Sequence, residues 1–227
     1  MESSTASSST ATAANNNVWL FYPNLIGYGR IVLAILAMYY MASSPCCAMI
    51  CYALSAGLDA FDGWAARTYN QSSRFGAMLD QLTDRCALLA LVMALCRLFP
   101  DHLFLLQLSA VVDIASHWLH LHATDLSGAT SHKQSSNWLL NLYYTDRMFL
   151  GFMCGGNEAF YILLYIRAFW AGPLIFGSFH FMSIFPLLAF PIAFVKSAIS
   201  IVHLYTAAEM VVAHDVKLRV EAAQKAK

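Results

Sequence analysis

The stretch LDAFDGWAARTYNQSSRFGAMLDQLTDRCA, residues 58–87, places four aspartates inside an otherwise apolar region of the chain. It contains the pattern D-x2-D-G-x2-A-R-x8-G-x3-D-x3-D, formed by Asp59, Asp62, Gly63, Ala66, Arg67, Gly76, Asp80 and Asp84. One aspartate at the centre of a membrane helix costs about 2.5–3.5 kcal/mol, so four would be prohibitive unless they face a wet cavity or bind cations. The pattern therefore predicts a metal site.

The composition is that of a membrane protein. Hydrophobic residues make up 59% of the chain and charged residues 11%, and the mean hydropathy is +0.56. An ordinary soluble domain is about 45–50% apolar and about 25% charged. The formal net charge is zero, which gives no indication of nucleic-acid binding. We therefore expect partners in the lipid bilayer and among small anions.

Apolar segments of about 20 residues indicate membrane helices. Such segments lie at 23–42, 46–66, 76–98, 102–122, 148–170 and 175–207, and the last is long enough to tilt or to run past the bilayer. The aromatic residues just before Pro23 predict a short interfacial segment. The predicted fold is an all-α polytopic membrane protein with six transmembrane helices and a short N-terminal interfacial helix.

The chain ends differ in composition from this core. Residues 1–17 are rich in Ser, Thr, Ala and Asn, so we expect a disordered tail. Residues 18–212 form the predicted membrane domain, and residues 213–227 a charged cytosolic tail. An even number of spans puts both termini on one side, together with Arg67, Arg74, Lys133, Arg147, Lys217, Arg219, Lys225 and Lys227. Arg97 and Arg167 fall opposite, so the termini and the aspartates are predicted to be cytosolic.

The spacing of the aspartates brings them together. Asp59 and Asp62 are three residues apart and Asp80 and Asp84 four apart, so each pair projects from one face of a helix. The short loop between the two helices makes them antiparallel neighbours. Carboxylates without His or Cys suit Mg²⁺ or Mn²⁺, and two such ions are a common arrangement for phosphoryl chemistry.

Other residues of the pattern suit a bound nucleotide. A side chain at Gly63 or Gly76 would obstruct the ligand, although a glycine in a membrane helix equally allows close helix packing. Arg67 and Arg74 can grip phosphate oxygens, and Ser73 can donate its hydroxyl.

This pattern resembles the signature of the CDP-alcohol phosphotransferase family without a departure. The resemblance extends to YPNLIGYGRI (22–31), DIASHWLHLH (113–122), SHK (131–133), YYTDR (143–147), CGGNEAFY (154–161) and FVKSAISIVHLYTAA (194–208), which are similar to the inositol-using eukaryotic branch of the family. It implies transfer of a phosphatidyl group from CDP-diacylglycerol to myo-inositol with release of CMP. It also implies a homodimer in the endoplasmic reticulum membrane.

The resemblance assigns roles to individual residues. Asp59, Asp62 and Asp80 match ligands to one divalent cation, and Asp59, Asp80 and Asp84 match ligands to a second. Asp84 also matches the proton acceptor. The positions that match CDP-diacylglycerol binding are Gly63, Arg67 and Ser73. We add Arg74 because it stands at a helix end, and Gly76 because it leaves room for a ligand.

The inositol pocket is predicted from polar residues expected on the cytosolic side. The candidates are Ser131, His132, Lys133, Asp146, Arg147 and Lys196. Arg147 and Lys196 resemble basic acceptor-pocket positions of related bacterial enzymes, but Arg147 is equally interpretable as a topology anchor. Lys196 lies within an apolar span, which favours a functional or paired lysine.

A second polar stripe lies in the fourth predicted span. Asp113, His117 and His120 share one helix face, with His122 close behind. They can shape a pocket or join helices by hydrogen bonds, or bind a transition metal. Asn157 and Glu158 in the fifth span are candidate partners for this stripe or for Arg30.

Three alternatives remain open at this point. The pattern fixes the donor chemistry and not the alcohol, so glycerol phosphate, serine or choline are possible acceptors. A divalent-metal channel or transporter would also place acidic residues in its spans, but it leaves the glycines and Arg67 unexplained. A non-catalytic lipid-binding scaffold would tolerate the loss of Asp84.

Overall fold

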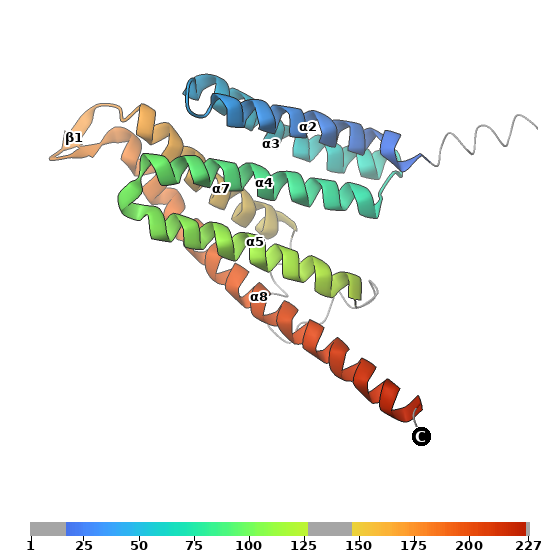
Figure 1. Cartoon of the computed structure of the whole chain (residues 1–227). Helices are drawn as coiled ribbons and strands as arrows, with labels where there is room; N and C mark the ends of the chain where they lie inside the picture. The colour runs from blue at the N-terminus through green and yellow to red at the C-terminus, as the bar shows by residue number, and fades with distance from the viewer. Residues whose placement is uncertain (1–16, 127–146, 226–227) are drawn as a thin grey trace, which may run out of the picture. The chain divides into compact units, whose positions relative to one another are not determined.

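The computed structural model describes residues 17–126 and 147–225, and the predicted spans are helical except at the start of the sixth (Figure 1). The predicted tail up to residue 16, and Ser131, His132, Lys133 and Asp146, lie outside the described residues. The elements are η1 (Val18–Leu20), α2 (Tyr22–Tyr40), α3 (Pro45–Thr68), α4 (Arg74–Leu98), η2 (Pro100–His102), α5 (Leu103–Leu126), α7 (Arg147–Phe169), β1 (Leu174–Phe176), β2 (Phe179–His180), η3 (Phe181–Ser183) and α8 (Ile184–Lys225).

The helices confirm a polytopic membrane protein. Among the described residues, four stretches are long and apolar enough to cross a membrane: Pro45–Thr68, Pro100–Leu126, Met148–Phe169 and Phe181–Lys225. α2 and α4 are also long, with 19 and 25 residues. The count of six crossings stays a prediction. Many large apolar side chains point outward, including Val32, Phe104 and Leu188, as expected for helices that face lipid.

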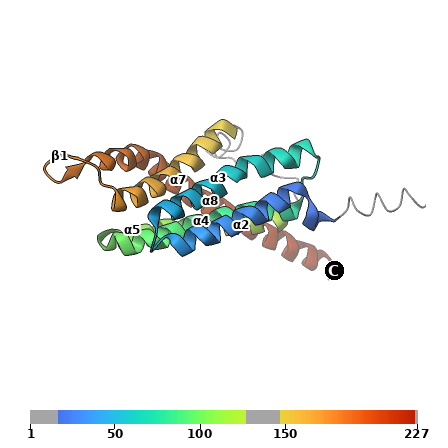
Figure 2. The same ribbon diagram turned by 90° about the horizontal axis from the view of Figure 1, so that it is seen from above.

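Residues up to Leu91 form a first compact unit, in which α2 packs along α3 (Figures 1 and 2). Each helix has a proline in its first turn, where the missing backbone N–H costs nothing. Small buried residues, Ala34 and Ala37 on α2 and Ala48 on α3, allow the two backbones to approach closely. The packing of α2 against α3 fixes the positions of the polar residues that these two helices carry.

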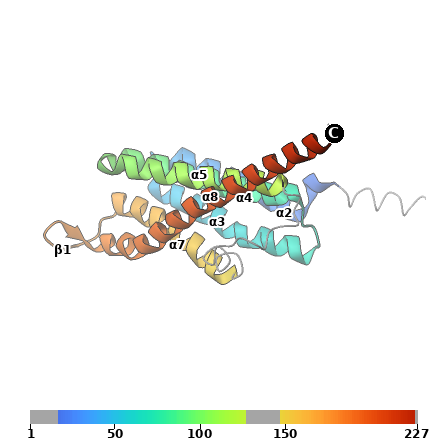
Figure 3. The same cartoon turned by 90° about the horizontal axis from the view of Figure 1, so that it is seen from below.

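Residues from Val92 onward form a second compact unit, in which α5 and α7 pack on α8 (Figure 3). α8 has 42 residues, which corresponds to roughly 63 Å of helix. The hydrocarbon core of a bilayer is about 30 Å thick, so α8 is long enough to extend well beyond it. Residues 213–225, predicted as part of a separate tail, continue α8 as helix.

A hairpin replaces the predicted start of the sixth span at residue 175. β1 and β2 pair antiparallel, and α8 begins only at Ile184. Gly172 and Gly177 have φ angles of +73° and +54°, which residues with a side chain rarely adopt. These glycines allow the chain to turn before and within the hairpin. The prediction from apolar composition therefore placed the start of the sixth helix too early.

The cysteines, all within the described residues, are free thiols.

Candidate metal and nucleotide site

The structure brings the four aspartates of the pattern together in the first unit. α3 carries Asp59 and Asp62, and α4 carries Asp80 and Asp84. Carboxylate oxygens of Asp59, Asp62 and Asp80 all lie within 4.8 Å of one another. The Asp62 side chain is 10% exposed, whereas those of Asp59, Asp80 and Asp84 are 46%, 44% and 38% exposed. The cluster therefore has a buried base and an open side.

Arg30 of α2 lies at the buried base of this cluster and contacts all four carboxylates. Its Nη1 is 2.8 Å from Asp59 Oδ1, 2.5 Å from Asp62 Oδ2 and 2.6 Å from Asp80 Oδ1. Its Nη2 is 2.5 Å from Asp84 Oδ1. The sequence suggested Asn157 or Glu158 as partners for Arg30, and the structure gives it these aspartates. One guanidinium balances one of the four negative charges.

The donor set fits a divalent cation. Carboxylate oxygens are the hard ligands that Mg²⁺ and Mn²⁺ prefer, and three of them are close enough to share one ion. Their partial exposure leaves a route from solvent. Asp84 is outside this group of three and joins the cluster through Arg30.

The turn between α3 and α4 is held to the start of α2. Gln71 Oε1 accepts a hydrogen bond of 2.8 Å from the backbone N–H of Tyr22. Tyr22 also packs on Tyr69, with ring centroids 4.9 Å apart. Ser73 caps α4, because its Oγ accepts a 2.9 Å hydrogen bond from the backbone N–H of Gly76. These contacts fix the entry of α4 and thereby the positions of its aspartates.

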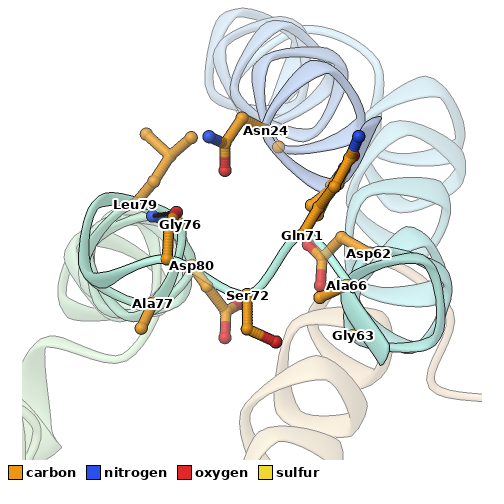
Figure 4. Close-up of a pocket in the computed structure, with 13 residues that line it drawn as sticks. Asn24, Asp62, Gly63, Ala66, Gln71, Ser72, Gly76, Ala77, Leu79 and Asp80 are labelled. Carbon is orange, nitrogen blue, oxygen red and sulfur yellow. Dashed lines mark hydrogen bonds between the residues drawn. The ribbon is translucent and has the colours of Figure 1, made fainter. Parts of the chain in front are cut away.

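A cavity of about 150 Å³ opens beside the cluster (Figure 4). Its lining is mostly small or polar and comes from α2, the α3–α4 turn and both acidic helices: Pro23, Asn24, Gly27, Asp62, Gly63, Ala66, Gln71, Ser72, Ser73, Gly76, Ala77, Leu79 and Asp80. Asn24 is 1% exposed, and its Oδ1 has no hydrogen-bond partner among the described residues. Three of the predicted nucleotide-binding residues, Gly63, Ser73 and Gly76, line this cavity.

The two glycines of the pattern differ in what surrounds them. A Cβ at Gly76 would lie 2.7 Å from Asn24 Oδ1 and 3.1 Å from Ser73 Oγ, so only glycine allows this approach of α2 to α4. A Cβ at Gly63 would meet the Arg67 guanidinium at 3.4 Å. Arg67 and Arg74 are exposed and do not line the described cavity.

In the second unit, Lys196 is paired. Its side chain is 3% exposed, and its Nζ is 2.5 Å from Asp113 Oδ1 and 3.2 Å from Ser200 Oγ. Asp113 also accepts from His117, whose Nδ1 is 2.7 Å from the Asp113 backbone oxygen and 3.6 Å from Oδ1. His120 stacks on His203 of α8, with ring centroids 4.9 Å apart. The predicted polar stripe thus joins α5 to α8.

Sequence reasoning did not connect Arg30 with the aspartates and did not single out Asn24 or Gln71. An arginine within a predicted membrane span is the signal that could have indicated Arg30, because such a charge requires a counter-charge. Asn24 and Gln71 gave no comparable signal. They stand in a helix start and a turn, where polar residues are ordinary.

The fold and the site define a helical membrane protein with a carboxylate cluster beside a small polar cavity. A family model of CDP-alcohol phosphatidyltransferase matches residues 20–139, which include the whole aspartate pattern and its cavity. The chain belongs to the CDP-alcohol phosphatidyltransferase family.

Full-length relatives are similar over most of this chain. A Drosophila melanogaster protein is 47% identical over 216 residues, covering 94% of each chain. A Rattus norvegicus protein is 51% identical over 202 residues, covering 88% of this chain and 94% of its own. A Schizosaccharomyces pombe protein is 39% identical, covering 89% and 93%. All three are named CDP-diacylglycerol–inositol 3-phosphatidyltransferase. No solved structure matches this chain.

Proposed function

We propose that this chain transfers a phosphatidyl group from CDP-diacylglycerol to myo-inositol and releases CMP. The observation that carries the proposal is the convergence of Asp59, Asp62, Asp80 and Asp84 beside the cavity. Inositol as the acceptor is supported by the names of the relatives that match nearly the whole chain. The family alone would leave the acceptor alcohol open.

The aspartates are proposed to bind two divalent cations, Mg²⁺ or Mn²⁺. Asp59, Asp62 and Asp80 would hold one, and Asp59, Asp80 and Asp84 the second. When bound, such cations would supply positive charge that offsets the charge of a diphosphate and of the departing CMP. The CDP part of the donor is proposed to lie in the cavity, where Gly63 and Gly76 leave room.

Ser73, Arg67 and Arg74 are proposed to bind the phosphate oxygens of the donor. The Ser73 hydroxyl oxygen already accepts from Gly76, and its hydrogen can still be donated to a phosphate oxygen. Arg67 and Arg74 stand exposed at the helix ends on either side of the turn. From there their guanidinium groups can reach a diphosphate that extends from the cavity, and their exposure leaves them free to reorient.

Asp84 is proposed to accept the proton of the attacking inositol hydroxyl. The inositol oxygen forms a bond to the lipid-side phosphorus, the anhydride bond breaks, and its electron pair leaves with CMP. The proton ends on the Asp84 carboxylate. A carboxylate that also binds cations is a weak base, so proton transfer is expected to run together with attack. The open side of the cluster, where the Asp84 side chain is 38% exposed, admits the acceptor.

The inositol pocket is proposed to use Ser131, His132, Lys133, Arg147 and Lys196. Only Lys196 has a described side chain, and its ion pair with Asp113 supports a structural role as well.

The active site and both termini are proposed to face the cytosol, with the protein in the endoplasmic reticulum membrane as a homodimer. The basic residues that accompany the termini support this orientation.

The experiment measures CMP release by purified protein in detergent, with CDP-diacylglycerol and inositol, glycerol phosphate, serine or choline in turn. Inositol-dependent release that requires Mg²⁺ or Mn²⁺ is expected. Asp84→Asn should abolish turnover while the donor still binds, and Asp101→Asn, an exposed aspartate outside the cluster, should keep the normal rate. Near-normal turnover by the Asp84 variant would refute the role of Asp84. Release with serine but not inositol would favour another acceptor, and Mn²⁺ flux into liposomes without CMP release would favour a transporter.

A further inference from the structure

One nitrogen of Arg30, Nη1, has more carboxylate partners than it has hydrogens. A terminal guanidinium nitrogen carries two hydrogens. Three carboxylate oxygens, from Asp59, Asp62 and Asp80, lie within 2.8 Å of Nη1 and compete for those two. Adding Asp84 at Nη2, the Arg30 guanidinium contacts four carboxylates, and a second arginine, Arg85, has its Nη2 3.9 Å from Asp84 Oδ2. Two arginines thus face four carboxylates, so the cluster is held together and its charge still favours a divalent cation.

Arg30 is held in place on the buried side of the cluster. The side chain is 1% exposed and reaches the cluster from α2, whereas the aspartates come from α3 and α4. Ser55 of α3 donates a buried 3.0 Å hydrogen bond to the Arg30 backbone oxygen, which anchors α2 beside α3 at this level. Arg30 thus enters the cluster from its buried base. A cation from solvent enters from the other side, where three of the carboxylates are about two-fifths exposed.

We propose that Arg30 is a positioning residue that gathers the four carboxylates and competes with divalent cations for their oxygens, so that it sets the cation affinity of the site. This inference rests on the proposed function in one respect, that the cluster binds divalent cations. It adds that Arg30 of α2, a helix that carries none of the four aspartates, weakens this binding while it holds the ligands in place. The competition follows because both cations use the same oxygen atoms.

Two measurements separate competition from a purely structural role. One is Mn²⁺ affinity by electron paramagnetic resonance of purified protein, and the other is the unfolding temperature in a chelator and in saturating Mn²⁺. Arg30→Met removes the charge and keeps the apolar stem. It should bind Mn²⁺ roughly tenfold more tightly, because a positive charge that contacts the same carboxylate oxygens is lost. In the chelator, its unfolding temperature should be lower than that of the wild type. Adding Mn²⁺ should raise the unfolding temperature of the variant by more than it raises that of the wild type.

Two further variants make the test specific. Arg97→Met removes an exposed arginine near the end of α4, away from the cluster, and should keep wild-type Mn²⁺ affinity. Arg30→Lys keeps the charge on one nitrogen, so it cannot serve both the Asp84 side and the other three carboxylates. It should bind Mn²⁺ more tightly than the wild type and less tightly than Arg30→Met. It also provides the test if Arg30→Met does not fold.

The result that overturns the inference is unchanged or weaker Mn²⁺ binding in both Arg30 variants, with equal losses of unfolding temperature in chelator and in Mn²⁺. Absence of saturable Mn²⁺ binding in the wild type would overturn the cation part of the proposed function and this inference together. Tight Mn²⁺ binding that Arg30 does not influence would overturn this inference alone.

Discussion

The ion pair between Lys196 of α8 and Asp113 of α5 is expected to stabilise the second unit by several kcal/mol. Both side chains are almost fully removed from solvent, at 3% and 13% exposed, and their charged atoms are 2.5 Å apart. Breaking a buried pair by removing one partner costs about 3–5 kcal/mol, because the other charge stays buried. Lys196→Met and Asp113→Leu should each lower the free energy of unfolding by about this amount.

The double variant Asp113→Leu/Lys196→Met should recover most of that loss. Replacing both partners of a buried pair with apolar residues of similar size is often neutral, so we expect a net cost of about 1 kcal/mol or less. The free energies are measured by denaturant unfolding in mixed micelles, followed by tryptophan fluorescence. Single variants that each cost only about 0.6 kcal/mol, the average for a hydrogen bond between membrane helices, would refute the reasoning.

The same double variant tests the predicted place of Lys196 in the inositol pocket. A stable double variant with a wild-type KM for inositol would assign Lys196 to structure alone. A raised KM for inositol, with an unchanged KM for CDP-diacylglycerol, would show that the lysine also contributes to acceptor binding.

Three further predictions concern the first unit. Gly76→Ala should lower the free energy of unfolding by about 1–3 kcal/mol, because its Cβ would overpack against Asn24, and it should weaken donor binding. The control Gly57→Ala, whose Cβ would meet nothing within 4 Å, should be neutral or stabilising by up to about 1 kcal/mol in a thermal melt. Equal effects of the two variants would contradict the close approach at Gly76. Ser73→Ala should cost about 0.5–2 kcal/mol by loss of the α4 cap, and an unchanged melting temperature would argue against that cap. Chelation of divalent cations should abolish CMP release reversibly, and activity that persists in excess chelator would contradict the proposed cation requirement.

The sequence predicted most of the fold because its signals are local. Long apolar segments fix helices, and the spacing of Asp59 with Asp62 and of Asp80 with Asp84 fixes the face from which each pair projects. The convergence of these pairs required only a short turn between two helices. The glycines at 172 and 177 show the limit of this reasoning, since an apolar hairpin and an apolar helix have the same composition.

The contacts that cross between helices could not be predicted in the same way. Arg30 reaches the cluster from α2, and no spacing rule specifies which charge in another helix it will meet. Lys196 was expected to be paired or functional because a buried lysine is costly, but its partner Asp113 lies 83 residues away. The sequence thus predicts that a buried charge needs a partner, and packing determines which one.

The central claim is that helices α3 and α4 bring their aspartates together to hold divalent cations. Anomalous scattering from crystals grown with Mn²⁺ and CDP tests this claim most directly. We predict manganese peaks among the carboxylates of Asp59, Asp62, Asp80 and Asp84, with the nucleotide beside them in the cavity lined by Gly63 and Ser73. Strong manganese peaks elsewhere, with none among these four side chains, would contradict it.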